Sequence, residues 1–161
     1  MQIQARNCQR RHRTPLRQLK KTAVTILNAL GCPENTELSI SIVGDRAIHR
    51  LNREYLGKDR PTNVISFSLQ EGAFGHLSPA LGDVVISADT AAREAEAAEV
   101  SSWERVAFLL LHGILHLTGY DHERSGEAEA RRMVKKEKEL YTLLVEAGLT
   151  KISEGAGSGR R

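Results

Sequence analysis

Alternating apolar and polar positions predict strands in the first half of the chain. Residues 38–42, LSISI, alternate strictly, which is typical of a strand with one buried face. Residues 64–69 are rich in β-branched and aromatic side chains, and residues 84–86 form a short apolar run, so both predict further strands. Residues 2–6 fit a short edge strand. The glycines and the proline within residues 70–81 predict a loop or lid between two strands.

Apolar residues at intervals of three and four predict two helices in the same half. The first is expected to follow Thr14 as its N-cap, with Pro15 in the first turn and Gly31 at its end. Asp45 is expected to cap a second, shorter helix that ends at Gly57. Helices and strands therefore alternate along this part of the chain.

Three more helices are predicted in the second half. Residues 89–99 are rich in alanine and glutamate, which favour a surface helix. Ser101 and Glu104 fit a capping box ahead of the apolar run 106–117, which indicates a buried helix. Residues 127–145 carry paired charges and predict a last helix. Together the elements predict an α+β fold, a small mixed four-stranded sheet packed with about five helices.

The length and the two ends of the chain bear on its domain organisation and location. The 161 residues fit one compact domain, expected over residues 1–152, followed by a flexible tail at 153–161. The polar, basic start has no apolar run behind it, so we expect neither a secretory signal nor a membrane span. Cys8 and Cys32 form no CxxC motif, which favours reduced thiols. We therefore expect a cytoplasmic protein.

Positive charge is concentrated at the start of the chain. Residues 1–21 contain seven basic residues and no acidic one, although the whole chain has a net charge of only +3. A basic patch of this kind suits a polyanion such as RNA. The same residues also fit the solvated face of an amphipathic helix, and the sequence does not decide between the two interpretations.

Half of the six histidines fall in the segment HGILHLTGYDH. His112 and His116 are four residues apart on the predicted buried helix, so their imidazoles project from one face. Gly119 allows the helix to end in a left-handed turn, after which His122 can return as a third ligand. Three imidazoles with an open fourth position are typical of a catalytic zinc site. We therefore predict one zinc ion at the end of the buried helix, where it would activate water for hydrolysis.

The spacing of these histidines matches the HExxHxxGxxH pattern of metzincin peptidases, with one difference. Gly113 occupies the position of the glutamate that polarises water in those enzymes, so the general base is missing unless Asp121 or Glu123 supplies it. A metallopeptidase-like hydrolase is therefore an alternative that the sequence disfavours. Asp121 could instead orient a liganding histidine. The remaining histidines, His12, His49 and His76, are expected to be ordinary surface or loop residues.

The histidine segment, together with LNREYLGKDRPTNVISF and LGDVVIS, resembles the YbeY family of bacterial rRNA maturation factors. The similarity extends from about Ser39 to Tyr141. It implies a zinc-dependent, single-strand-specific endoribonuclease that acts in 16S rRNA 3′-end maturation and in ribosome quality control. It implies His112, His116 and His122 as the zinc ligands. The implied partners are rRNA, the small ribosomal subunit and a ribosome-assembly GTPase; an assembly factor with a structural metal remains a further alternative.

One departure from the family pattern concerns the RNA phosphate. The family commonly has an arginine in a YRGKD-like segment, where this chain has Leu56. Stabilising a phosphodiester transition state requires positive charge, so Lys58 or Arg60 would have to position the phosphate. Only seven aromatic residues are present, and several are expected in the core, so no base-stacking platform is expected. The general base is not identified from the sequence.

Overall fold

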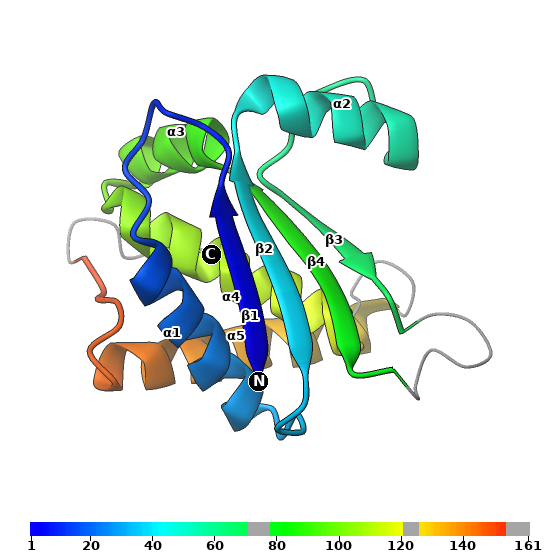
Figure 1. Ribbon diagram of the computed structural model, residues 1–161. Coiled ribbons are helices and arrows are strands. Elements are labelled where there is room, and N and C mark those ends of the chain that lie inside the picture. The colour runs from blue at the N-terminus through cyan, green and yellow to red at the C-terminus, as the bar shows by residue number, and fades with distance from the viewer. Residues whose placement is uncertain (71–77, 121–125, 154–161) are drawn as a thin grey trace.

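The computed structural model describes residues 1–70, 78–120 and 126–153. Four strands form one mixed sheet in the order β1-β2-β4-β3, in which β1, β2 and β4 are parallel and β3 is antiparallel to β4 (Figure 1). The described residues also form five helices, which confirms the predicted α+β fold. The strands are β1 (Gln2–Asn7), β2 (Glu37–Val43), β3 (Val64–Ser68) and β4 (Ala80–Ser87); the helices are α1 (Leu16–Ala29), α2 (Asp45–Leu56), α3 (Ala88–Ala98), α4 (Ser102–Leu117) and α5 (Gly126–Glu146).

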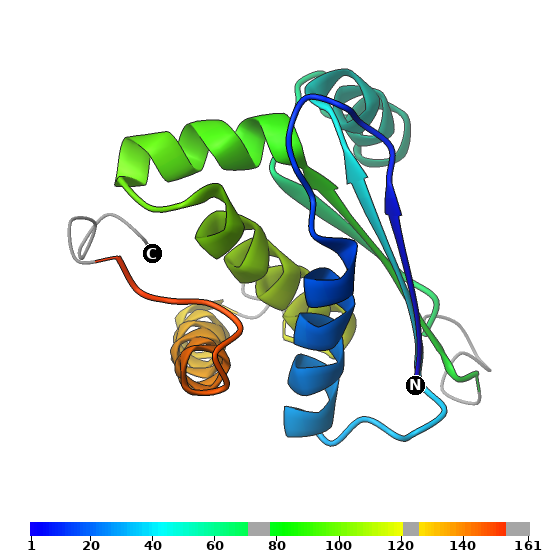
Figure 2. The same ribbon diagram turned by 60° about the vertical axis from the view of Figure 1, so that its left-hand side comes forward.

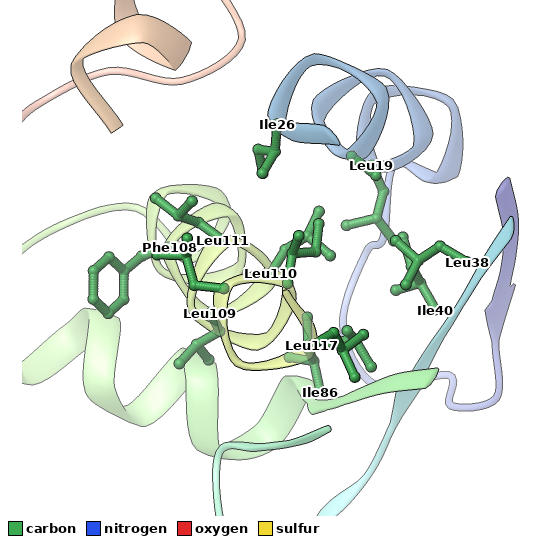
Figure 3. Packing of buried hydrophobic residues seen from close by; sticks show 14 of the residues in the cluster. Leu19, Ile26, Leu38, Ile40, Ile86, Phe108, Leu109, Leu110, Leu111 and Leu117 are labelled. Atoms are coloured by element: carbon green, nitrogen blue, oxygen red, sulfur yellow. The ribbon is translucent and has the colours of Figure 1, made fainter. Parts of the chain in front are cut away.

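One face of the sheet carries the main hydrophobic core. Helix α1 packs on β1 and α4 packs on β3 and β4, while α5 lies against α1 and α4 on their far side from the sheet (Figure 2). The alternating side chains of β2 that point to this face, Leu38, Ile40 and Ile42, are almost fully buried, as the sequence pattern predicted. Leu110 and Leu117 of α4 lie in the same cluster (Figure 3). The buried helix α4 is therefore fixed on several sides.

Among the helices that the structure describes, α2 alone packs on the opposite face of the sheet (Figure 2). A separate small core forms there between Ile48 of α2 and the strand residues Val43, Ile65 and Val85. Polar side chains of β1, β2 and β4 occupy much of the remaining face, where they line a shallow hollow of about 140 Å³. The two faces thus differ sharply in how much apolar surface they bury.

Two predicted helix caps are wrong because their side chains form other bonds. Helix α1 is preceded by Pro15 without a side-chain cap, and the hydroxyl of Thr14 accepts a hydrogen bond from Gln9 at 3.2 Å. The N-cap of α2 is Gly44, and the carboxylate of Asp45 accepts bonds from Ser87 at 2.7 Å and from Thr90 at 2.6 Å. Strand β4 is longer than predicted because it pairs with both β2 and β3.

The segment that follows α5 is tied back to the helices. The carbonyl oxygen of Leu149 accepts hydrogen bonds from Trp103 Nε1 at 2.7 Å and from Gln18 Nε2 at 2.9 Å. The backbone N–H of Ser153 donates to Glu104 at 2.9 Å. Residues 149–153 therefore bridge α1 and α4.

Two further findings concern sequence predictions about the cysteines and about membranes. Cys8 and Cys32 are free thiols, as expected. Within the described ranges, no helix combines the length and the apolar character that crossing a membrane requires.

Candidate metal centre

Helix α4 presents two of the three predicted zinc ligands. Its start is fixed by the predicted capping box, in which Ser101 accepts from the N–H of Glu104 and Glu104 accepts from the N–H of Ser101. Most of the helix is buried between the sheet, α1, α3 and α5. His112 and His116 lie one turn apart near its C-terminal end, and each is partly exposed. The surrounding core thus fixes the helix while leaving both imidazoles accessible.

The two imidazoles converge on one point. Their Nε2 atoms are 3.1 Å apart, and the ring centroids are 4.7 Å apart. Two nitrogens that bind one tetrahedral zinc ion at 2.0–2.1 Å each would be about 3.3 Å apart. The separation between these two nitrogens therefore fits a shared ion with only a small adjustment. Two neutral imidazoles in this arrangement can supply two of the four ligands of a tetrahedral zinc ion.

Glu137 of α5 supports the first of these histidines. Its Oε2 lies 2.6 Å from Nδ1 of His112, and the side chain is buried, with 7% of its surface exposed. A carboxylate that accepts the Nδ1 proton leaves the lone pair of Nε2 free for a metal and fixes the orientation of the ring. Sequence reasoning missed Glu137. Its signal was a carboxylate within the apolar stripe of α5, in register with Met133, Leu140, Tyr141 and Leu144.

Helix α4 ends in the left-handed turn that Gly119 predicted. Gly119 has a φ of 101°, and the N–H groups of Gly119 and Tyr120 donate to the carbonyls of His116 and Leu115, which forms a Schellman motif. His122 lies outside the described residues, as do Asp121, Glu123 and His76. Among the residues that the structure describes, no group of three metal-binding side chains is found. The role of His122 as third ligand stays a prediction.

The packing of Gly113 explains why no glutamate stands at this position. A Cβ atom added at Gly113 would lie 2.8 Å from Cγ1 of Val84 and 3.2 Å from the hydroxyl of Ser66. The hydroxyl of Ser66 donates to the carbonyl of Gly113 at 3.0 Å. Position 113 therefore faces the sheet at close range. A glutamate side chain at this position could not reach the two histidines without displacing β3 or β4.

The two predicted phosphate-positioning residues lie in the loop after α2. Lys58 and Arg60 are exposed, and neither side chain pairs with an acid among the residues described. Asn52 holds the loop, because its side chain donates to the carbonyl of Arg60 at 2.8 Å and its own carbonyl accepts from the N–H of Lys58 at 3.1 Å. Neither cation forms a hydrogen bond with His112 or His116 in the described structure. Their role toward a phosphate stays a prediction.

The end of α2 also exposes a ring that the sequence reasoning did not identify. Tyr55 is 66% exposed, and its ring packs edge-on against Phe67 of β3 with centroids 5.6 Å apart. Leu56, at the position of the family arginine, is 51% exposed beside it. An exposed, supported aromatic ring is the kind of surface on which a nucleobase stacks. The absence of a base-stacking platform stays a prediction, and Tyr55 is the exposed ring at which it can be tested.

The basic residues at the start of the chain are dispersed over the molecule. Arg6 lies on the open side of β1 and donates to Ser41, whereas Arg11 pairs with Asp89 at the start of α3. Arg17, Lys20 and Lys21 lie on α1, around a surface hollow. The charge cluster in the sequence therefore does not form a single patch.

Two other histidines lie within hydrogen-bond distance of carboxylates away from the candidate metal centre. His12 Nε2 lies 2.9 Å from Asp89, and His49 Nε2 lies 2.7 Å from Asp59. The hydrogen bond from His49, together with its charge, lowers the pKa of the Asp59 carboxyl. These two histidines have partners that account for them without a metal.

Comparison with known proteins gives a consistent result. The model of the family described as Endoribonuclease YbeY matches residues 3–145. The chain is 63% identical over 150 residues to Endoribonuclease YbeY of Geobacter sulfurreducens, a match that covers 92% of this chain and 99% of that protein. It is 44% identical over 117 residues to Endoribonuclease YbeY of Bacillus subtilis, covering 68% of this chain and 73% of that one.

A solved structure supports the fold. The solution structure of a Thermotoga maritima protein aligns with a TM-score of 0.59 at 17% sequence identity, covering 95% of this chain and 98% of that one. At this identity the likeness concerns the architecture alone. The family match and the level of identity to several relatives settle the relationship. The chain belongs to the family described as Endoribonuclease YbeY.

Proposed function

We propose that this chain is a zinc-dependent endoribonuclease that hydrolyses single-stranded RNA. The names of its relatives, Endoribonuclease YbeY, support the nuclease activity. The observation that carries the zinc dependence is the convergence of two Nε2 atoms at 3.1 Å, with one of the two rings anchored by a buried carboxylate. A histidine pair that serves only to fill space would not require this carboxylate.

Each group at the site has a distinct role in the proposal. His112 and His116 would hold the ion together with His122, and Glu137 would keep the proton of His112 on Nδ1. A zinc ion bound there would polarise a phosphoryl oxygen and lower the pKa of a water molecule, which is the chemistry that hydrolysis needs at neutral pH. Lys58 and Arg60 would hold the phosphate of the strand. The general base is not assigned.

The surroundings of Gly113 favour a nuclease over a peptidase. In zincin peptidases, the residue after the first histidine supplies the glutamate that activates water. Here that position faces β3 and β4, and the described part of the site offers no carboxylate in its place other than Glu137, which is engaged with His112. Phosphodiester hydrolysis can rely more heavily on metal and cationic groups. The metal site is thus better suited to RNA than to peptides.

We further propose that the substrate is rRNA at the small ribosomal subunit in the cytoplasm. The proposal covers maturation of the 16S rRNA 3′ end and a part in ribosome quality control, with a ribosome-assembly GTPase as a partner in that process. Membership of the family supports this assignment. Selectivity on the ribosome would come from the subunit, because phosphate contacts carry no sequence information by themselves.

Metal content and RNA cleavage test the proposal together. The purified protein should contain one zinc ion per chain, and His112→Ala and His116→Ala should lose it, whereas His12→Gln, a substitution at a histidine paired with Asp89, should retain it. Precursor 16S rRNA should be cleaved by the zinc-loaded protein but not after chelation, and casein should remain intact. The His116→Ala variant should lose RNA cleavage by several orders of magnitude, since the metal is central to catalysis.

Three results would contradict the proposal. If the zinc content is unaltered in both the His112→Ala and the His116→Ala variants, these histidines do not bind the metal. Casein cleavage with intact RNA would instead support the peptidase alternative. Binding to ribosomal subunits without cleavage by the zinc-loaded protein would support a structural metal in an assembly factor.

A further inference from the structure

The outer face of α2 carries a cluster of basic side chains. Arg46, His49, Arg50 and Arg53 line a surface hollow of about 350 Å³. Their spacing of three and four residues places them on one side of the helix, while Ile48 and Asn52 are buried on the other side. The sequence reasoning assigned no role to these arginines.

The charge of this arginine cluster is compensated only in part. No ion pair of Arg46, Arg50 or Arg53 occurs within the described ranges. Asp59 binds His49 within the cluster, and its charge also interacts with that of Arg53. Asp45 pairs with Arg93 instead. Within the described ranges, Glu54 forms no ion pair and does not line the hollow. Like charges one turn apart on a helix oppose helix formation. A cluster of this kind costs stability unless a negatively charged ligand binds it.

The cluster is separate from the metal centre. Helix α2 packs on the sheet face opposite to α4, which carries His112 and His116 (Figure 2). The arginines point away from that sheet, since the buried side of α2 faces it. A short ligand at the two histidines therefore could not reach the arginine cluster, whereas a long strand could contact both by passing around the edge of the sheet.

We propose that the arginine cluster binds phosphates of an RNA strand at a distance from the site of cleavage. The inference rests on the proposed function for the identity of the polyanion. Guanidinium groups bind phosphate oxygens through paired N–H donors, and several at helical spacing suit a ligand with repeated negative charges. Among the described residues, basic side chains alone line the hollow, without an apolar anchor of the kind that protein interfaces contain. RNA is therefore favoured over a protein partner.

The binding experiment compares two matched double variants. Arg46→Gln/Arg50→Gln removes two charges from the cluster, and Lys135→Gln/Lys138→Gln removes two exposed charges from α5. Both are measured in a His116→Ala background, so that the RNA stays intact, with circular dichroism melting as a check of folding. Fluorescence anisotropy of a long labelled single-stranded RNA should show about tenfold weaker binding for the α2 variant. The slope of log K against log salt should fall by about 1.4, and the control should match the parent.

A cleavage experiment in the wild-type background adds a second measure. With a long RNA, the α2 variant should raise KM while kcat stays unchanged; with a short RNA that spans only the scissile site, both parameters should match the parent. Unchanged RNA affinity and salt slope in the α2 variant, or equal losses in the α5 control, would overturn the inference. The two proposals can fail separately: if the wild type binds RNA through α2 but never cleaves it, the RNA-binding role of the cluster is supported and the nuclease proposal fails.

Discussion

The two faces of the sheet hold their functional residues in different ways. On the face covered by α1 and α4, a continuous core surrounds the histidine helix, and Gly113 brings its backbone against the sheet. On the other face, α2 is attached through one small cluster around Ile48, and its outer side carries exposed arginines. Groups that must hold a fixed geometry thus lie where packing is dense, and groups suited to a flexible polyanion lie where it is sparse.

This contrast predicts two kinds of mutational effect. Substitutions on the α4 side should change stability and metal binding together, because each histidine depends on several neighbouring elements. Substitutions of the arginines on α2 should change affinity for RNA with little effect on folding, since exposed helix positions tolerate replacement.

The strongest test of the dense face is Gly113→Glu, which restores the peptidase glutamate. The new side chain would meet Val84 and Ser66, so we expect a loss of roughly 3 kcal/mol or more in unfolding free energy, through overpacking and burial of a carboxylate. Urea denaturation measures the loss, and casein cleavage should stay absent. Ala97→Glu, at an exposed position of α3, should change stability by less than about 0.5 kcal/mol. A Gly113→Glu protein of normal stability would show that α4 does not pack closely on the sheet.

A second test concerns the link between α5 and the histidines. Glu137→Gln removes the charge that orients His112, so zinc affinity should fall roughly 10- to 100-fold while the protein remains folded. Competition with a fluorescent zinc chelator measures the change. Glu139→Gln, at an exposed position of the same helix, should bind zinc like the parent. Equal affinities for the two variants would mean that His112 is positioned by α4 alone.

The smallest expected effect is at the junction between the two faces. The pKa of Asp89 is lowered because the N–H of Asp45 donates to it, against the opposing effect of burial and with a further bond to His12. Because the pKa of Asp89 is lower in the folded state, its carboxylate stabilises the fold at pH values above the unfolded pKa of about 3.9. This stabilisation is lost as the pH falls through the folded pKa. Asp89→Asn should therefore cost about 1 kcal/mol at pH 7, and the difference from wild type should shrink below about pH 4.

Urea unfolding at a series of pH values checks this expectation. Glu96→Gln, at an exposed position on the same helix, serves as the control. A wild-type advantage over Asp89→Asn that persists unchanged in acid would show that the Asp89 carboxylate does not join α3 to α2.

The parts of the fold that the sequence predicted are those governed by local patterns. Strand β2 and the capping box of α4 follow from alternation and from a four-residue motif, and both are confirmed. Asp45 failed as a cap because Ser87, which is distant in the sequence, binds its carboxylate, and Thr14 failed because its hydroxyl accepts a hydrogen bond from Gln9. Periodicity carries no information about such partners.

In the candidate site, too, local patterns predicted some residues, while others depend on tertiary packing. His112 and His116 could be paired from their spacing on one helix, whereas Glu137 comes from another helix and depends on how α5 packs. The reason why glycine occupies position 113 also became clear only from the structure. In the sequence it indicated only a missing base, but the contacts with Val84 and Ser66 show that the space for a side chain is absent as well. The arginine face of α2 was visible in the sequence, but not its position relative to the sheet.

The hydrogen bonds at Leu149 have a practical consequence for where the protein can be cut. The family match ends at residue 145, yet residues beyond it contact the helices. The carbonyl of Leu149 accepts hydrogen bonds from Gln18 and Trp103, and the N–H of Ser153 donates to Glu104. A fragment trimmed to the matched range would lose these contacts and leave the indole of Trp103 without its acceptor. Expression fragments and fusion junctions should therefore be placed after Ser153, even though conventional boundary rules would place them earlier.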